Sequence, residues 1–321
     1  MFEKIVRSKL RIVSDQEYPL KKFYILTHKK HRREILFEEG NLDALKFMKP
    51  KFNSLKKKGI YFLLKIGILQ PFLKEIWLPH RQGNLIFVGG QIKVFNFNNS
   101  EVLSFCMPHQ KKEDFLRSRN VQKKMGVLGF APRIFKIDER RIFSREELLS
   151  SPEKIDEQKI FRKLMEYYNT LKINKIKSNE YIKTLKVDLR NKKIQDKFLS
   201  EVFCLLQEDP KILYLLNCHG DFAEGQILEK RKGVVFSDWA PYENLITEDI
   251  SNFFRYTENL LSNNKILEIW KLYPPEIQND LAYYLILCEI RHVIWKPFYL
   301  GQAKKRIRNL INSPYFKDNY K

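Results

Sequence analysis

Cysteine is scarce in this sequence. Its 321 residues contain only Cys106, Cys204, Cys218 and Cys288, and no two of these form a C-x-x-C pair. The spacing excludes the common zinc-binding motifs and gives no basis for a disulfide framework. Isolated thiols of this kind are typical of a reducing compartment, so we expect a cytoplasmic protein.

Long apolar runs are also missing. The first residues, MFEKIVRSKLRIVSDQ, lack the apolar run of roughly 7 to 15 residues that a signal peptide needs. The most apolar window, residues 59–73, is interrupted by Lys65 and Pro71 and is shorter than the ~20 residues that span a bilayer. Lysines occupy positions 56–58 before this window, and Trp77 follows it. The segment is therefore either a helix packed on the protein's own core or a basic amphipathic segment in peripheral contact with the inner face of an anionic membrane.

Acidic residues are in deficit, with 38 Asp and Glu against 59 Lys and Arg, which gives a net charge of +21. A field of this sign attracts phosphates, nucleic acids and anionic membranes without choosing among them. The sequence has no zinc-finger, RNA-binding-sheet or helix-turn-helix spacing. Nucleic-acid binding is therefore a hypothesis that rests on charge alone. The hydrophobic content of 44% is enough for a sizeable core, and the length suits two lobes or domains.

Changes of pattern divide the chain, because it has no internal repeat and no low-complexity linker. Residues 1–80 are charged and mixed, and after the apolar stretch KKFYILTHKK we expect helical segments over residues 42–78, forming a basic, helical N-terminal extension. From residue 84 the run NLIFVGGQIKVFNFNNSEVLSFCM predicts a hairpin or three-stranded antiparallel meander. A helix over residues 112–125 and two strands around Asp138-Glu139 complete a small β-rich region, residues 81–150.

The pattern after residue 151 is mostly helical. Two apolar stripes at helical spacing are visible, one with Ile160, Leu164 and Tyr168 and one with Phe198, Val202 and Leu205 or Leu206. Two short strands, QILEK and GVVFSD, joined by a turn from Lys230 to Gly233, interrupt the helices, which resume from Asp249. Strands, one helix and more strands, followed by a helical region over residues 151–321, predict an α+β fold.

The stretch NCHGDFAEGQIL holds the residue types that suggest chemistry. Asp221 follows His219-Gly220, and Gln226 lies five residues after Asp221, at the start of a predicted strand. The predicted hairpin ends at Asp238, so two acids and an amide come to one end of one hairpin. Phosphoryl transfer needs such groups: one carboxylate accepts or orients the proton of the attacking hydroxyl, while a second carboxylate and a side-chain oxygen hold Mg²⁺ on the phosphates of ATP.

The wording HGDFAEGQIL…VVFSDWA resembles the H-G-D-x-x-x-x-N…(I/F)-D-W pattern of the aminoglycoside phosphotransferase and choline kinase family, within the protein-kinase-like superfamily. The resemblance covers about residues 84 to 300. It implies a bilobal fold with a small antiparallel β-rich N-lobe and a larger, mainly helical C-lobe, and it implies ATP and Mg²⁺ as cofactors. The implied roles are a catalytic base at Asp221, a residue that orders the catalytic loop at His219, Mg²⁺ ligands at Asp238 and Gln226, and a helix acid that braces the loop at Asp249.

The chain departs from the family pattern in its first lobe. Kinase-like enzymes hold the ATP phosphates with a lysine on a strand. The corresponding position in this chain lies near Cys106 or Met107, and neither is a lysine. The helix that supplies an acid to that lysine offers Arg117 and Arg119 instead. Lys93 is the remaining candidate for binding the nucleotide, with Glu113 as its acid.

Two further positions follow from the same resemblance. Gln226 stands where the family has Asn, and its amide oxygen lies one methylene further from the backbone. Glu146 and Glu147 fall where the family's hinge meets adenine through backbone hydrogen bonds, so we expect no role for their side chains.

Besides nucleic-acid binding, two functional hypotheses remain open. The first is an ATP- and Mg²⁺-dependent kinase that phosphorylates a hydroxyl of a small anionic or sugar-like acceptor, such as a glycan intermediate of the bacterial cell surface. The HGDFA sequence and the basic apolar segment that precedes it resemble phosphotransferase-family proteins of surface-glycan synthesis. The second is a catalytically degenerate pseudokinase that acts as a binding or scaffold protein, at a membrane surface for example. Retention of Asp221 and Asp238 favours the first, and loss of the Lys and Glu pair favours the second.

Overall fold

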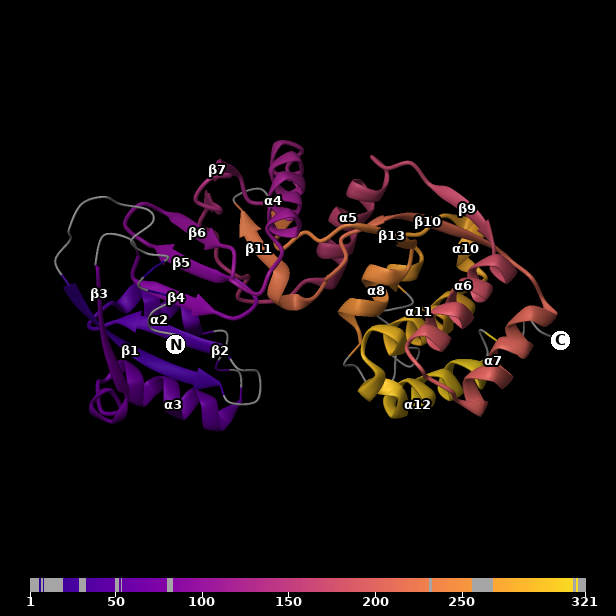
Figure 1. Cartoon of the computed structure of the whole chain (residues 1–321), viewed down its shortest axis with the longest axis horizontal. Helices are drawn as coiled ribbons and strands as arrows, with labels where there is room; N and C mark the ends of the chain where they lie inside the picture. Colours follow the sequence, from indigo (N-terminus) through magenta and orange to yellow (C-terminus); the bar gives the residue numbers. More distant parts are fainter. Residues whose placement is uncertain are drawn as a thin grey trace. The chain divides into compact units, whose positions relative to one another are not determined.

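The computed structural model describes residues 20–28, 33–49, 52, 54–79, 83–230, 233–255, 268–313 and 316, together with positions 6 and 8. The chain forms two compact units (Figure 1). Unit 1 comprises Met1–Glu153 and Leu228–Asp238, and unit 2 comprises Lys154–Ile227 and Trp239–Lys321. Among the described residues, no helix combines the length and apolarity needed to cross a bilayer.

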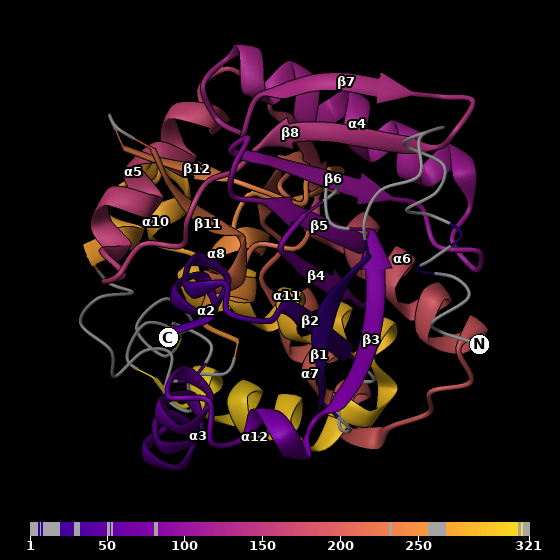
Figure 2. The ribbon, with the colours of Figure 1, turned by 90° about the vertical axis from the view of Figure 1, so that its left-hand side faces the viewer.

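Unit 1 is built on an eight-stranded antiparallel sheet with the order β3-β1-β2-β4-β5-β6-β8-β7 (Figure 2). The strands are β1 (Leu20–His28), β2 (Arg33–Glu38), β3 (Lys74–Pro79), β4 (Leu85–Val88), β5 (Ile92–Asn96), β6 (Glu101–Phe105), β7 (Ile134–Asp138) and β8 (Phe143–Glu147). The predicted meander is present as β4, β5 and β6, which pair in sequence order. The two strands predicted around Asp138-Glu139 are β7 and β8.

Both faces of the sheet are covered by apolar side chains, because successive residues of a strand point to opposite faces. In β1, Phe23 and Ile25 belong to one core cluster, and Tyr24 belongs to the other. The second cluster also takes in residues of the helices α2 (Leu42–Met48) and α3 (Leu55–Lys65). These two helices therefore pack on the Tyr24 face of the sheet.

The first eighty residues differ from the expected helical extension. Helices α2 and α3 are present, and the short helix η3 (Gln70–Phe72) follows them, but β1, β2 and β3 pair into the same sheet as β4–β8. The apolar stretch KKFYILTH forms a strand because its alternate side chains serve the two cores. Most of residues 1–19 lie outside the described part of the chain.

Helix α4 (Lys112–Val127) contacts β7 and confirms the helix predicted from residue 112. It buries Phe115, Arg119 and Gln122, which share one face at i, i+4 and i+7. The predicted hairpin is also present, as β11 (Ile227–Lys230) and β12 (Gly233–Phe236), although turn residues 231–232 lie outside the described part. The amide of Phe236 donates to the carbonyl of Phe130 at 2.8 Å, which attaches β12 to the segment between α4 and β7.

Unit 2 is mainly helical and contains a three-stranded antiparallel sheet, with the order β13-β10-β9, that the sequence analysis did not anticipate. The strands are β9 (Asn174–Lys177), β10 (Ile212–Cys218) and β13 (Tyr242–Leu245). The helices are α5 (Glu157–Tyr168), α6 (Ser178–Asn191), α7 (Lys197–Glu208), α8 (Glu248–Phe253), α10 (Pro275–Gln278), α11 (Leu281–Trp295) and α12 (Leu300–Ile311), with the short helices η5 (Glu224–Gln226) and η6 (Pro297–Tyr299).

The apolar stripes of unit 2 match the expectation in α5, and in α7 they match at Val202 and Leu206 but not at Phe198. Ile160, Leu164 and Tyr168 are all buried on α5. On α7 the buried stripe begins at Leu199 and continues through Val202, Phe203 and Leu206. The ring of Phe198 is half-buried instead, with the guanidinium of Arg308 4.8 Å from its centroid.

Candidate functional site

The loop that follows β10 carries the H-G-D sequence, and Gly220 determines its course. Gly220 has a φ of +98°, and a Cβ at this position would lie 2.0 Å from the carbonyl oxygen of Ala240. A side chain is therefore excluded by both conformation and space. The amide of Ala240 also donates to the carbonyl of His219 at 3.1 Å, so the loop and the segment after Asp238 are joined at close range.

Asp249 braces this loop from helix α8, as the resemblance implied. Its carboxylate accepts hydrogen bonds from the amides of His219 (2.7 Å) and Gly220 (3.3 Å) and from the hydroxyl of Tyr168 (2.8 Å). The side chain is fully buried, and burial raises its pKa to about 6, against the lowering effect of these hydrogen bonds. Three donors on one buried carboxylate hold the loop backbone in a single position.

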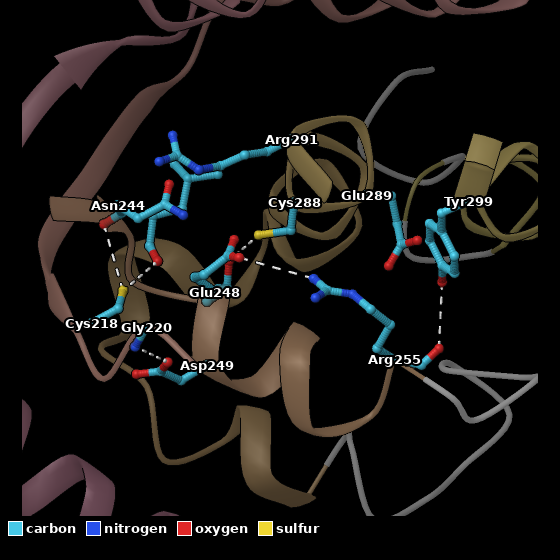
Figure 3. A network of polar contacts seen from close by, with 12 residues as sticks. Cys218, Gly220, Asn244, Glu248, Asp249, Arg255, Cys288, Glu289, Arg291 and Tyr299 are labelled. Carbon is cyan, nitrogen blue, oxygen red and sulfur yellow. Dashed lines mark hydrogen bonds and ion pairs between the residues drawn. The ribbon is translucent and has the colours of Figure 1, made fainter. Parts of the chain in front are cut away.

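A buried polar layer continues from this brace into the helices of unit 2. Figure 3 shows Asp249 directed toward Gly220, and its neighbour Glu248 directed toward Arg255, with 3.9 Å between the charged groups. The thiol of Cys218, at the end of β10, donates to the carbonyl of Leu245 at 3.2 Å. Burial raises the pKa of this thiol, so Cys218 stays protonated and serves as a small packing residue.

His219 is fully buried and points away from solvent. Its ring packs against Trp239, with the centroids 4.5 Å apart, and against Phe222, with the centroids 5.4 Å apart. Trp239 in turn packs edge-on against Tyr167, whose hydroxyl donates to the carbonyl of Asn217 at 2.8 Å. The ring of His219 therefore packs among aromatic side chains of the core.

Asp221 is an exposed residue of the loop that Asp249 braces. The side-chain amide of Gln226 donates to Oδ2 of Asp221 at 3.4 Å, so the predicted base and the predicted amide ligand are neighbours within unit 2. Gln226 lies in the short helix η5, where its backbone amide donates to the backbone carbonyl of Ala223 at 2.9 Å.

A second group of predicted residues meets within unit 1. Nζ of Lys93, on β5, lies 2.6 Å from Oδ1 of Asp238, just after β12. Glu113, expected as the acid for Lys93, is exposed in the first turn of α4. Lys93 therefore pairs with Asp238 and not with Glu113, the acid that the family resemblance suggested.

Asp238 adopts a backbone conformation that side chains rarely take, with a φ of +57°. Asp tolerates the left-handed region better than most residues, but the conformation still costs free energy. Strain of this kind concentrates at functional sites, where surrounding contacts hold the residue in place. The ion pair with Lys93 is one such contact.

Arg119 is the residue of this group whose role the sequence analysis missed. Its side chain is fully buried on α4, with Nη2 3.7 Å from Oδ1 of Asp238 and Nη1 3.6 Å from Oε2 of Glu146. Glu146 also accepts hydrogen bonds from Ser104 (2.9 Å) and from Gln122. The expectation that the side chain of Glu146 has no role is therefore wrong, because this buried carboxylate compensates the charge of a buried arginine. An arginine on the Phe115–Gln122 stripe of α4 is the signal that could have identified the network.

The predicted nucleotide and metal ligands carry donor atoms of suitable types. Asp238 offers a carboxylate that already receives a cation, the ammonium of Lys93, and Gln226 offers an amide oxygen; both are the hard oxygen donors that Mg²⁺ prefers. Lys93 and Arg119 supply positive charge suited to phosphates. These side chains fit Mg²⁺ and a nucleoside triphosphate by donor type. Among the described residues, no group of three or more His, Cys, Asp or Glu side chains is arranged to hold a metal.

Comparisons with known proteins complete the description. No family model matches the sequence, and no curated protein matches it. Solved structures that match include a choline/ethanolamine kinase family protein from Mesorhizobium loti, at 14% identity and a TM-score of 0.43, covering 73% of this chain and 86% of that one. Choline kinase LicA from Streptococcus pneumoniae matches at 15% identity and a TM-score of 0.44, covering 73% of this chain and 88% of that one.

Proposed function

We propose that this chain is a phosphotransferase that uses ATP and Mg²⁺ to phosphorylate a hydroxyl group of a small molecule. The observation that carries the proposal is the loop that Asp249 holds rigid, because it presents the exposed carboxylate of Asp221 next to the amide of Gln226. In this function Asp221 accepts the proton of the acceptor hydroxyl as its oxygen attacks the γ-phosphate. A carboxylate fixed by its backbone suits this task, since phosphoryl transfer depends mainly on positioning and electrostatics.

The remaining site residues have supporting roles in the proposal. Asp238 in unit 1 and Gln226 in unit 2 would each offer an oxygen ligand for Mg²⁺, which would neutralise charge on the transferring phosphates. Lys93 contacts the nucleotide phosphates, and Arg119 keeps Asp238 oriented from the buried side. His219 keeps the loop in place through its aromatic neighbours.

We further propose that the acceptor is anionic or sugar-like, as a glycan intermediate of the bacterial surface would be. The support is the net charge of +21, which raises the local concentration of anionic substrates.

A coupled ADP-release assay with a panel of acceptors tests the function. The panel includes sugars, sugar phosphates, choline and ethanolamine. Asp221→Asn should lower kcat about 100-fold or more and leave ATP binding within a few-fold of the wild type, because only the proton acceptor is removed. Glu224→Gln, which changes an exposed carboxylate of the same loop, is the matched control and should retain activity. Equal activity of Asp221→Asn and the wild type would exclude Asp221 as the base.

A pseudokinase is the second candidate, and one observation favours it. The carboxylate of Asp238 already lies beside two cations, Lys93 and Arg119, and α4 directs a buried arginine to the region where kinase-like enzymes carry an acid. A thermal-shift titration separates the two candidates. Stabilisation by ATP with Mg²⁺ that is lost in Asp238→Asn supports the phosphotransferase, whereas an unchanged melting temperature in both proteins supports the scaffold.

A further inference from the structure

Helix α3 has two apolar faces, only one of which is used by the core. Leu64 is fully buried, and Ile60 and Tyr61 pack beside it in the second core cluster of unit 1. On the other side Leu55, Phe62 and Ile66 follow one another at i, i+7 and i+11, which places them on one stripe. All three are exposed, Leu55 by 89%. A helix that only packed on its own core would carry polar residues there.

The segment that follows α3 in the sequence also exposes apolar side chains. Ile68, Phe72 and Trp77 are exposed, Phe72 by 82%. In strand β3, Ile76 and Leu78 point into the first core cluster, so Trp77 lies on the opposite face of the sheet, the face on which α3 packs (Figure 2). We define the α3 surface as these exposed apolar residues: Leu55, Phe62, Ile66, Ile68, Phe72 and Trp77.

Exposed lysines flank the residues of the α3 surface in the sequence. Lys56, Lys57 and Lys58 occupy the first turn of α3, Lys65 is its last residue, and Lys74 begins β3; all five are exposed. The first turn of α3 contains no acidic residue. Apolar side chains with an aromatic at the edge and lysines around them complement an anionic lipid bilayer, whose headgroups pair with the ammonium groups while the apolar groups enter the acyl boundary.

We propose that the α3 surface docks unit 1 on a membrane that contains anionic lipids. Apolar contact and charge act together, since neither a few apolar side chains nor a few lysines alone gives stable attachment. Docking of this kind brings the protein to lipid-borne molecules without a spanning helix. It is independent of the catalytic proposal, because none of its residues belongs to the candidate site.

Co-sedimentation of the full chain with vesicles tests the docking. Phosphatidylcholine vesicles that contain phosphatidylglycerol should bind the wild type, and pure phosphatidylcholine vesicles should not; raised salt should weaken the binding. The double variant Phe62→Ser/Phe72→Ser and the triple variant Lys56→Gln/Lys57→Gln/Lys58→Gln should each bind about tenfold more weakly or worse. Trp77 emission should shift to shorter wavelength with anionic vesicles, and Trp77→Phe should lose this shift.

Phe298→Ser is the matched control, because Phe298 is 88% exposed in unit 2, away from the α3 surface in the sequence. It should bind as the wild type does. Failure of the wild type to bind phosphatidylglycerol vesicles, or equal binding by the double Phe variant, overturns the proposal. A second copy of the chain is the competing occupant of the α3 surface, and sedimentation velocity tests for it. A dimer that the double Phe variant abolishes would assign the α3 surface to that second copy.

Discussion

The ammonium of Lys93 lies 2.6 Å from Oδ1 of Asp238, joining two residues that are 145 positions apart in the sequence. The pair is partly exposed, with side-chain exposures of 21% and 33%. A cation in this place satisfies the carboxylate without a metal. If Asp238 binds Mg²⁺ as proposed, Lys93 would have to exchange its partner, and nucleotide phosphates would be the natural new partner for the released ammonium.

The exchange leads to the first prediction, for Lys93→Met. Loss of the ammonium should weaken binding of ATP with Mg²⁺ about tenfold or more, because a charge-assisted contact to phosphate is removed. Binding of Mn²⁺ without nucleotide should become tighter, because the competing cation is gone. Titration calorimetry measures the first effect and paramagnetic resonance the second. Lys21→Met, an exposed lysine on β1, is the control and should change neither. Unchanged affinities in Lys93→Met would contradict the exchange.

The second prediction concerns Arg119, the buried cation of the same network. Arg119→Met should destabilise unit 1 by about 3 to 5 kcal/mol, because it leaves the carboxylate of Glu146 buried without its counter-charge. The double variant Arg119→Met/Glu146→Gln should recover part of this loss, since it removes both charges. Arg117→Met, on the exposed side of α4, should stay within about 0.5 kcal/mol of the wild type. Urea denaturation gives all three values, and a double variant no more stable than Arg119→Met would rule out the coupling.

The Lys93–Asp238 and Arg119–Glu146 contacts also show where sequence reasoning reached its limit. Motif spacing predicted Asp221 and Asp238 as site residues and placed Asp249 under the H-G-D loop, because a loop or hairpin is formed by residues that lie close together in the sequence. The ion pairs of Lys93 and Arg119 depend on which strands and helices become neighbours in the fold. A single sequence does not reveal those neighbours. Lys93, for example, lies opposite Ser104 in the β5–β6 register, a pairing that forms only when the two strands meet in the sheet.

A similar limit explains the first eighty residues. The alternation in KKFYILTH serves two separate cores, so every residue from Phe23 to Ile25 is buried and the period of two is hidden. The short strands β9, β10 and β13 were missed for a related reason, since β10 reads as a continuous apolar run, ILYLLNC. Helices were easier to predict, because α4 and α5 carry their stripes within one segment.

The third prediction compares two glycines of the H-G-D loop. Gly220→Ala should lower stability by more than about 1 kcal/mol and abolish activity, because its Cβ would meet the carbonyl of Ala240 at 2.0 Å in a left-handed backbone. Gly225→Ala should be close to neutral, since a Cβ at Gly225 has no atom within 4 Å and its φ is ordinary. Thermal melting and the ADP-release assay measure both variants. Similar behaviour of the two would show that the tight approach of loop and Ala240 is not required.

The fourth prediction is a pH dependence that comes from Asp249. Burial raises the pKa of this carboxyl from its ordinary value of 3.8 to about 6, so the folded protein holds its proton over a range where the unfolded chain has released it. The stabilisation is therefore complete below about pH 4 and is lost as the pH rises through about 6. Relative to Asp249→Asn, which does not titrate, the wild type should gain about 3 kcal/mol in free energy of unfolding between about pH 7 and about pH 4, at ~1.4 kcal/mol for each pKa unit.

Asp196 provides a control of opposite sign for this titration. Burial acts to raise its pKa, but the hydrogen bonds from Lys304 and from the amide of Leu199 outweigh burial and lower it. Its stabilising contribution should therefore be present above its ordinary pKa and disappear as the pH falls through the lowered value. Urea denaturation of Asp249→Asn and Asp196→Asn across the acid range should then give differences from the wild type that change in opposite directions with pH. Parallel changes would mean that the net charge of the chain, and not the brace under the H-G-D loop, governs its acid stability.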